Sequence, residues 1–273
     1  DHRESRGLGD VYKRQIEDVD YLIIACDTRA ALGYVKIAAD SGVKKILCEK
    51  PLFTPSNVDF FDTEIDWRRV YVAYNRRFYD AVQRFSQKLR DFSEAGRRKL
   101  IHFTIPESLP SLGDRYFALR SNGVHMVDLA RYMLGGFEVH SLSDLTESSA
   151  ILSLSGERHS GLLVFRFNAN VNTEISFDSD RVTYRLCPIE RYSEVSSMEI
   201  MEAIVDERTV RSYSPIEDAT SVIDDRLFAG KPGFQRQLEA FLGDEQQIVW
   251  GTVEDARDNV KLVETIVDAL TKA

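Results

Sequence analysis

Cysteine is scarce in this sequence, and its three copies are far apart. Cys26, Cys48 and Cys187 are spread over 273 residues, without the close pairs typical of metal-binding or redox motifs. Two of them fall in expected buried strands. This usage predicts a reduced protein without disulfides and without a bound metal, and therefore a cytoplasmic one.

Long apolar runs and an excess of basic residues are also lacking. No stretch is long enough to cross a membrane, and no secretory signal pattern is present. Lys and Arg number 35 against 44 Asp and Glu, giving a net charge of −9, which argues against a nucleic-acid-binding surface. The length of 273 residues suffices for two domains with sizeable cores.

A strand–helix–strand unit occupies residues 20–52. Tyr21–Ala25 is a continuous apolar run, as in a parallel strand buried on both faces, and Val43–Cys48 is a second one. Between them, Asp27 or Thr28 is placed to cap a helix over Arg29–Ser41. We expect the apolar stripe of this helix to consist of Ala30, Tyr34, Ile37, Ala38 and Ser41.

The glycine fingerprint that opens a dinucleotide-binding domain is missing. Gly7-Leu8-Gly9 follows no strand, and Tyr12 stands where the third glycine is needed. Residues 1–15 are polar and aperiodic, similar to translated sequencing adapter, and are expected to be non-native. We expect the natural product to begin roughly 50 to 70 residues earlier, with another strand–helix unit.

Three short sets of polar residues are candidate site residues. Two of them follow predicted strands, and the third lies in a predicted helix. Glu49-Lys50-Pro51 ends the second strand, where a lysine can polarise an oxygen or pair with Glu49 in solvent. Asn75, Arg76 and Arg77 follow a strand over Arg69–Tyr74, and the arginines suit either phosphate recognition or a structural carboxylate pair.

The third group lies in a helix over Ser121–Leu134, with Ser121 or Asn122 as its cap. Asp128 is three residues after His125 and on the same face, so it could orient the imidazole as in a base–orienter pair. The alternatives are a structural histidine and a metal-dependent hydrolase. The sequence offers no further clustered ligands for the latter.

The sequence pattern of the remaining residues predicts further helices and two regions of strands, and these elements indicate the fold class. Helices are expected over Phe53–Asp66, Tyr79–Asp91, Phe234–Leu242 and Val253–Leu270, the last capped by Thr252, and strands over Lys99–Ile105 and in antiparallel order over Ile151–Tyr213. This predicts an α/β, Rossmann-like parallel sheet over 16–98, incomplete at its N-terminus. An α+β domain with a large, mostly antiparallel sheet follows over 99–273. A face of that sheet could pair with a second subunit.

The segments GVKKILCEKPL, VYVAYNRRF and SNGVHMVDL, in this order and spacing, resemble the Gfo/Idh/MocA family of nicotinamide-dependent sugar oxidoreductases. The resemblance runs from about Val19 to the last helix. It implies NAD or NADP as cofactor, hydride transfer to or from a carbon of a sugar or nucleotide sugar, and a homodimer or homotetramer formed through the C-terminal sheet. The sequences of the last two segments look most similar to those of family members found with cell-surface polysaccharide genes.

The resemblance also implies roles for individual residues. Lys50 would polarise the reacting oxygen, His125 would be its acid or base, and Asp128 or Asn122 would steady His125. The cofactor-binding set would be Ala25, Cys26, Asp27, Thr28, Glu49, Lys50, Pro51, Asn75 and Arg77. The substrate-binding set would be Tyr74, Arg76, Ser121, Asn122 and His125.

Two positions depart from the family pattern. Ser121 stands four residues before His125, where family members often have an acidic residue, and Ala31 stands where they often have a histidine. These departures keep open a second hypothesis, that of a catalytically inactive protein that senses a sugar or NAD on the same fold. The residue that separates NAD from NADP is expected in the missing N-terminal part.

Overall fold

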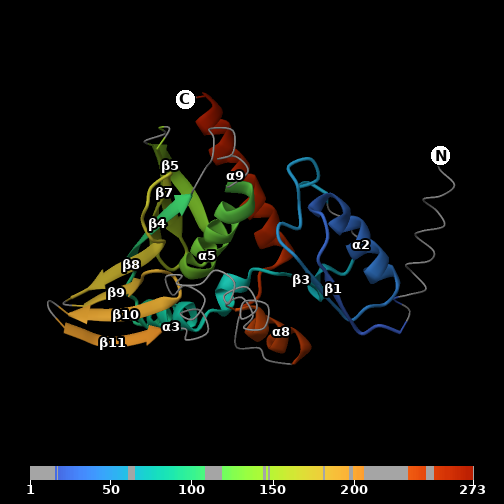
Figure 1. The fold of residues 1–273 in the computed structure, drawn as a ribbon, viewed down its shortest axis with the longest axis horizontal. Coiled ribbons are helices and arrows are strands. Elements are labelled where there is room, and N and C mark those ends of the chain that lie inside the picture. Colours follow the sequence, from blue (N-terminus) through green and yellow to red (C-terminus); the bar gives the residue numbers. More distant parts are fainter. Residues whose placement is uncertain are drawn as a thin grey trace, which may run out of the picture.

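The computed structural model contains two sheets flanked by helices (Figure 1). It describes residues 16, 18–60, 65–107, 119–143, 146, 148–180, 182–196, 199–205, 233–243 and 249–272. The segment 1–15, expected to be non-native, lies outside these residues.

The first sheet is parallel and built as the sequence predicts. Its strands are β1 (Tyr21–Ile24), β2 (Lys45–Cys48) and β3 (Val70–Val72), in that order. The helix α2 (Thr28–Asp40) connects β1 to β2, and Asp27 caps it by accepting a hydrogen bond from the Arg29 backbone N–H at 2.9 Å. The predicted strand–helix–strand unit is confirmed.

Two details of this unit differ from expectation. The α2 residues that are buried are Ala31, Val35 and Ala38, so the buried face is rotated from the predicted stripe, and the small alanines allow the helix to approach the sheet closely. Within the described sheet β1 is an edge strand, and Ile23 is 50% exposed. The prediction that this strand is buried on both faces is therefore wrong for the residues described.

The helix expected over Phe53–Asp66 is also not formed in the described residues 53–60, which contain turns. The Asn57 Oδ1 accepts a hydrogen bond from the Thr54 backbone N–H at 2.7 Å, and the Asn57 backbone N–H donates to the Thr54 carbonyl at 3.1 Å, so the two residues close a local turn. A short 3₁₀ turn, η1 (Trp67–Arg69), then leads into β3.

The second sheet has eight strands in the order β11-β10-β9-β8-β4-β7-β6-β5. All neighbouring strands run antiparallel except β4 and β7, which pair in parallel. Their bounds are β4 (Leu100–Glu107), β5 (Phe137–Ser143), β6 (Ser149–Gly156), β7 (Ser160–Phe167), β8 (Glu174–Ser179), β9 (Val182–Leu186), β10 (Arg191–Ser196) and β11 (Glu199–Val205). The predicted fold class, a parallel sheet followed by a large, mostly antiparallel one, is confirmed.

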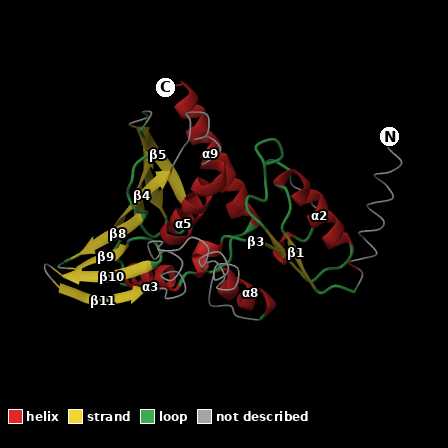
Figure 2. Ribbon diagram, in the orientation of Figure 1, coloured by secondary structure: helices red, strands yellow, loops and turns green. Residues whose placement is uncertain are grey.

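Helices cover one face of the second sheet (Figure 2). The 3₁₀ turn η2 (Asn75–Phe78) leads into α3 (Asp80–Glu94), whose Phe85 packs edge-to-face on Phe177 of β8 at 5.2 Å between ring centroids. The π-helical turn η3 (Leu119–Gly123) leads into α5 (Val124–Leu134), which packs on β6 and β7. The side chains of β6 and β7 alternate between buried and partly exposed, which leaves the opposite face of these strands open.

The C-terminal helices connect the two sheets. The helix α8 (Phe234–Leu242) places Phe241 edge-to-face on Tyr71 of β3, and the Lys45 ammonium donates to the Gly243 carbonyl at 3.0 Å. The helix α9 (Val253–Lys272) is capped by Thr252, as predicted, and packs along α5. The described C-terminal segment therefore contacts the first sheet directly, and α9 reaches the second through α5, which packs on β6 and β7. None of the helices in the described part of the chain is both long and apolar enough to span a membrane.

Candidate functional site

The carboxyl ends of β1, β2 and β3 meet at one edge of the first sheet. The turn Ala25–Thr28 follows β1, Glu49–Pro51 follows β2, and Tyr74–Arg77 follows β3. Parallel α/β sheets bind ligands at this edge because the loops there come together above the strand ends. The turns that follow the three strands therefore lie along one edge of the sheet.

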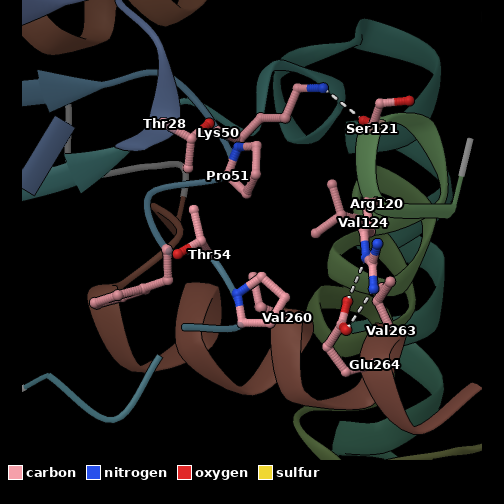
Figure 3. A pocket seen from close by; sticks show the side chains of 12 residues that line it. Thr28, Lys50, Pro51, Thr54, Arg120, Ser121, Val124, Val260, Val263 and Glu264 are labelled. Carbon is pink, nitrogen blue, oxygen red and sulfur yellow. Dashed lines mark hydrogen bonds and ion pairs between the residues drawn. The ribbon is translucent and has the colours of Figure 1, made fainter. Parts of the chain in front are cut away.

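The Lys50 side chain links this edge to the second half of the chain. Its part-buried ammonium donates a hydrogen bond to the Ser121 carbonyl at 2.6 Å, and Ser121 lies in η3, immediately before α5 (Figure 3). The Glu49 carboxylate accepts a hydrogen bond from the Lys50 backbone N–H at 3.1 Å. The lysine therefore extends from the end of β2 to the start of the helix that carries His125.

A cleft of about 370 Å³ lies between these segments. Its lining combines strand-end residues with residues of η3, α5 and α9: Thr28, Lys50, Pro51, Phe53, Thr54, Pro55, Arg120, Ser121, Val124, Val260, Val263 and Glu264 (Figure 3). The volume falls in the range of small-molecule sites. Of the predicted cofactor turn only Thr28 lines this cleft, whereas Ala25, Cys26 and Asp27 are exposed, and Asp27 pairs with Arg29 at 2.9 Å.

His125 is almost enclosed at the start of α5. It is 9% exposed, its Nδ1 is buried without a hydrogen-bond partner, and the Tyr74 ring lies edge-to-face at 6.1 Å. Burial lowers the pKa of His125 well below its usual value, and the positive charges of Arg76 and Lys50 lower it further. The imidazole is therefore neutral near pH 7 and able to accept a proton.

Asp128 does not orient His125, contrary to the sequence prediction. Its two carboxylate oxygens accept hydrogen bonds from Arg77 Nε at 2.8 Å and Nη2 at 2.6 Å, and Asn259 donates a third at 3.2 Å. Arg77 and Asp128 are each 1% exposed. A planar guanidinium satisfies both oxygens of a buried carboxylate, which an imidazole cannot do. Arg77 is accordingly engaged in this ion pair and does not line the cleft.

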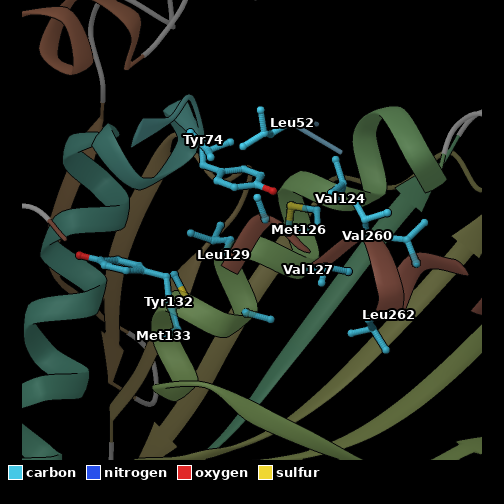
Figure 4. Close-up of a cluster of buried hydrophobic side chains, with 14 of the residues drawn as sticks. Leu52, Tyr74, Val124, Met126, Val127, Leu129, Tyr132, Met133, Val260 and Leu262 are labelled. Atoms are coloured by element: carbon cyan, nitrogen blue, oxygen red, sulfur yellow. The ribbon is translucent and has the colours of Figure 1, made fainter. Parts of the chain in front are cut away.

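The neighbours of Arg77 are part of the core. Its guanidinium lies over the Tyr132 ring at 5.2 Å and over the Tyr74 ring at 5.9 Å, and Nη2 also contacts Asp255 at 3.2 Å. Figure 4 shows Tyr74 and Tyr132 among the apolar side chains of α5. Tyr74 is 1% exposed, so this predicted substrate contact is enclosed in the core, and Asn75 is likewise buried.

Glu107, which the sequence analysis did not single out, is a buried acid beside Arg76 and Asn122. It is the last residue of β4 and 4% exposed, and its carboxyl forms a hydrogen bond with the Asn122 side chain and faces the charge of Arg76. Burial raises its pKa to about 7, against the opposing effects of Arg76 and Asn122. One feature of the sequence could have identified Glu107 as buried. Side chains alternate along β4, and Glu107 continues the inward-facing series Ile101, Phe103 and Ile105.

Asn122 is used differently from the prediction. The helix α5 has Gly123 as its cap residue and no side-chain capping bond, so neither Ser121 nor Asn122 caps it. Asn122 instead contacts Glu107, and the Ser121 carbonyl receives Lys50. Among the residues described, no group of three or more His, Cys, Asp or Glu side chains could hold a metal ion.

Comparison with known proteins places this geometry in a known fold. No family model matches the sequence. An inositol 2-dehydrogenase of Mycolicibacterium vanbaalenii is 31% identical over 97 residues, which is 34% of this chain and only 28% of that protein. An inositol dehydrogenase homologue of Azotobacter vinelandii, solved in complex with NAD⁺, superposes with a TM-score of 0.61 at 16% identity, over 98% of this chain and 80% of that one.

A Gfo/Idh/MocA family oxidoreductase of Vibrio cholerae superposes with a TM-score of 0.62 at 13% identity, over 95% of this chain and 81% of that one. At these identities the likeness concerns the fold. The chain has the two-sheet fold of the Gfo/Idh/MocA oxidoreductases, and the resemblance drawn from its three motif segments is confirmed at that level.

Proposed function

We propose that this chain belongs to an oxidoreductase that uses NAD or NADP to oxidise or reduce a hydroxyl-bearing carbon of a sugar or related polyol. The observation that carries this proposal is the 2.6 Å hydrogen bond from Lys50 to the Ser121 carbonyl. It joins the ligand-binding edge of a parallel sheet to the turn before His125, with a small-molecule cleft between them. Lys50 lines this cleft, and His125 follows the lining residue Val124 in the chain. Alcohol oxidation requires a cation and a neutral base of this kind.

The residues around the cleft suit a nicotinamide cofactor. The Thr28 hydroxyl and the Lys50 ammonium can bind ribose oxygens, while Pro51 and Val124 offer apolar surface to a flat ring. The cofactor would supply the carbon that accepts or donates hydride, and the protein would supply binding, orientation and charge.

The chain's own contribution is to stabilise charge and to move a proton. As a hydroxyl is oxidised, its oxygen becomes more negative on losing its proton, and the Lys50 ammonium stabilises that charge. His125, neutral because burial, Arg76 and Lys50 lower its pKa, takes the proton on its imidazole. In the reverse direction the imidazolium returns the proton to the oxygen.

The names of the similar proteins support a cyclic polyol or sugar as substrate, since two of them are inositol dehydrogenases or homologues of one. More narrowly, we propose a nucleotide-activated or amino sugar of cell-surface polysaccharide synthesis as the substrate. This proposal is based on the amino-acid sequence of the YNRRF and GVHMVDL segments. The proposed partner is a second copy of the chain, seated on the open sheet face where Leu162 and Val164 are partly exposed.

Exchange of Lys50 for Met tests the proposal. In purified full-length protein, nicotinamide fluorescence reports cofactor binding, and a panel of polyols and nucleotide sugars is screened for changes at the nicotinamide absorbance. We expect Lys50→Met to lower kcat/KM at least 100-fold, because it removes the cation at the reacting oxygen. Lys44→Met is the matched control, since Lys44 lies at the opposite end of β2 and pairs with Asp20 at 2.9 Å.

The outcomes separate the candidate functions. Loss of turnover in Lys50→Met with retention in Lys44→Met supports the oxidoreductase. Bound nicotinamide without turnover on any substrate supports the sensing protein that Ala31 and Ser121 left open. A folded full-length protein that binds no nicotinamide contradicts the proposal.

A further inference from the structure

Arg120 lies next to the Lys50 contact in the lining of the cleft. Ser121, whose carbonyl accepts the hydrogen bond from Lys50, directly follows Arg120 in η3, and all three residues line the cleft (Figure 3). The cleft has a volume of about 370 Å³, which suits a single small molecule. A ring that occupies it can therefore contact Lys50 with one substituent and Arg120 with another.

Arg120 forms a two-bond ion pair with Glu264 of α9, which also lines the cleft. The Arg120 Nε donates to Glu264 Oε1 at 2.7 Å, and Nη2 donates to Oε2 at 2.7 Å. The guanidinium has further N–H donors, and each carboxylate oxygen can accept more than one hydrogen bond. The pair therefore offers donors and acceptors side by side at the surface of the cleft.

The charge around this pair is balanced by acids. The hydrogen bonds to Glu264 raise the pKa of Arg120, and the negative charge of Asp268, one turn further along α9, adds to this effect. Because two acids act on one arginine, a carboxylate or phosphate of a ligand gains little attraction there. A hydroxyl, which both donates and accepts a hydrogen bond, suits the pair better.

The side chains beside the pair are apolar. Val124 of α5 and Val260 and Val263 of α9 line the cleft next to Arg120 and Glu264 (Figure 3). Small-molecule sites commonly combine an apolar lining with a few polar groups that fix the orientation of the ligand. The C–H groups of a sugar or cyclic polyol can pack on the valines while its hydroxyls meet the ion pair.

Resting on the proposed function, we propose that Arg120 and Glu264 are specificity-determining residues that together bind two neighbouring hydroxyls of an uncharged sugar or polyol ring whose reacting oxygen lies at Lys50. The Glu264 carboxylate accepts hydrogen bonds from these hydroxyls. Arg120 holds the carboxylate in place and donates to a hydroxyl oxygen. A ring that lacks the hydroxyls, or carries a carboxylate in their place, leaves the pair without its partners and binds more weakly.

The first experiment measures binding to the full-length protein by calorimetry, with NAD⁺, myo-inositol, D-glucose and D-glucuronate as ligands. We expect a neutral ring to bind the wild type more tightly than D-glucuronate does. Glu264→Gln should weaken the binding of that neutral ring at least about tenfold, because the charged acceptor is lost. The dissociation constant for NAD⁺ should change less than about twofold, since the pair contacts the substrate and not the cofactor.

Lys261→Met is the matched control for Glu264→Gln. Lys261 lies three residues before Glu264 on α9 and pairs with Asp59 at 2.6 Å, outside the lining of the cleft. Its removal should leave the affinity for the ring as in the wild type. The Arg120 and Glu264 side chains are 46% and 22% exposed, so Glu264→Gln is expected to fold, and urea denaturation checks this.

Each outcome of the binding experiment decides the proposal. Unchanged affinity for the ring in Glu264→Gln overturns it, as does tighter binding of D-glucuronate than of D-glucose by the wild type. A loss confined to NAD⁺ also overturns it, because the pair then binds the ribose hydroxyls of the cofactor. A wild type that binds none of the rings overturns it as well. A wild type that binds rings but no NAD⁺ contradicts the proposed function instead, and the ring titrations then decide the role of the pair alone.

The second experiment measures kcat and KM for the best substrate of the polyol and nucleotide-sugar panel and for its monodeoxy analogues. Because the pair holds the ring away from the reacting carbon, Glu264→Gln should raise KM at least about tenfold and change kcat less than about threefold. The wild type should reject loss of a hydroxyl at two neighbouring ring positions at least about tenfold, and Glu264→Gln less than about threefold. A fall in kcat at unchanged KM, or equal rejection by both proteins, overturns the proposal.

Discussion

Arg76 and Arg77 are neighbours in sequence and lie in opposite kinds of surroundings. Arg77 is 1% exposed, donates two hydrogen bonds to Asp128, and is flanked by the rings of Tyr74 and Tyr132. Arg76 is partly exposed and faces Glu107 and His125, the two buried groups whose protonation can change near neutral pH or during a proton transfer. One arginine fixes a charge in the core, and the other adjusts the charge of a site.

The difference follows from what each guanidinium meets. A buried bidentate pair has its charges satisfied at one fixed geometry, so removal of either partner leaves an uncompensated charge in the core. The acid beside Arg76 can instead gain a proton, so loss of that arginine leaves a neutral carboxyl rather than a buried charge. The first cluster should therefore affect folding, and the second should affect pH dependence.

The largest effect is expected at Arg77. Arg77→Met should lower the free energy of unfolding by about 3–5 kcal/mol, because Asp128 keeps only the bond from Asn259. Arg76→Met is the matched control and should cost less than about 1 kcal/mol, since Glu107 can then be protonated. Urea denaturation at pH 7 measures both.

A double variant tests the cause of that loss. Arg77→Met combined with Asp128→Leu removes both charges, and it should recover most of the stability lost in Arg77→Met alone. Equal losses in Arg76→Met and Arg77→Met would show that the two neighbours do not differ as argued.

An effect of intermediate size is expected from Glu107 and pH. Its pKa in the folded chain is about 7 against an ordinary 4.5, so the folded state binds the proton more tightly than the unfolded state. The stabilising contribution is then complete below pH 4.5 and is lost as the pH rises to about 7. The wild type should lose up to about 3 kcal/mol more than Glu107→Gln between these pH values.

Urea denaturation of both proteins at pH 4.5, 6 and 7.5 measures this difference, and comparison with Glu107→Gln cancels the other groups that titrate in the same range. Parallel curves for the two proteins would mean that the carboxyl has an ordinary pKa. In that case Arg76 and Glu107 would form a fixed ion pair like that of Arg77 and Asp128.

The sequence was sufficient for features that depend on local pattern. The bounds of α8, the Thr252 cap of α9 and the strand–helix–strand unit over residues 20–52 follow from spacing and end signals, which act over a few residues. The family resemblance of their motifs is what assigns Lys50 and His125 to one proposed site.

Other features depend on distant parts of the chain. The neighbouring sequence does not show which of Arg76 and Arg77 is buried. The pairing with Asp128, 51 residues further on, and the turn geometry of η2 decide that it is Arg77. Glu107 ends a strand, where an acid is ordinarily solvent-exposed, but η3 packs against β4 and Glu107 is buried. Helical spacing alone predicts a contact between Asp128 and His125. In the structure the Asp128 carboxylate pairs with Arg77 instead, because a guanidinium can donate to both of its oxygens.

The smallest effect is expected at Arg120 and Glu264, which line the cleft (Figure 3). This pair has the same two-bond geometry as Arg77 and Asp128, with both N–O distances at 2.7 Å, but its side chains are 46% and 22% exposed. Water therefore competes for both charges, and Glu264→Gln should cost less than about 1 kcal/mol, and less still at 1 M salt. Thermal unfolding at low and high salt measures this, with Arg120→Gln and the double variant completing the cycle. A coupling energy as large as that of the Arg77 pair would show that bond geometry rather than burial sets the strength of these pairs.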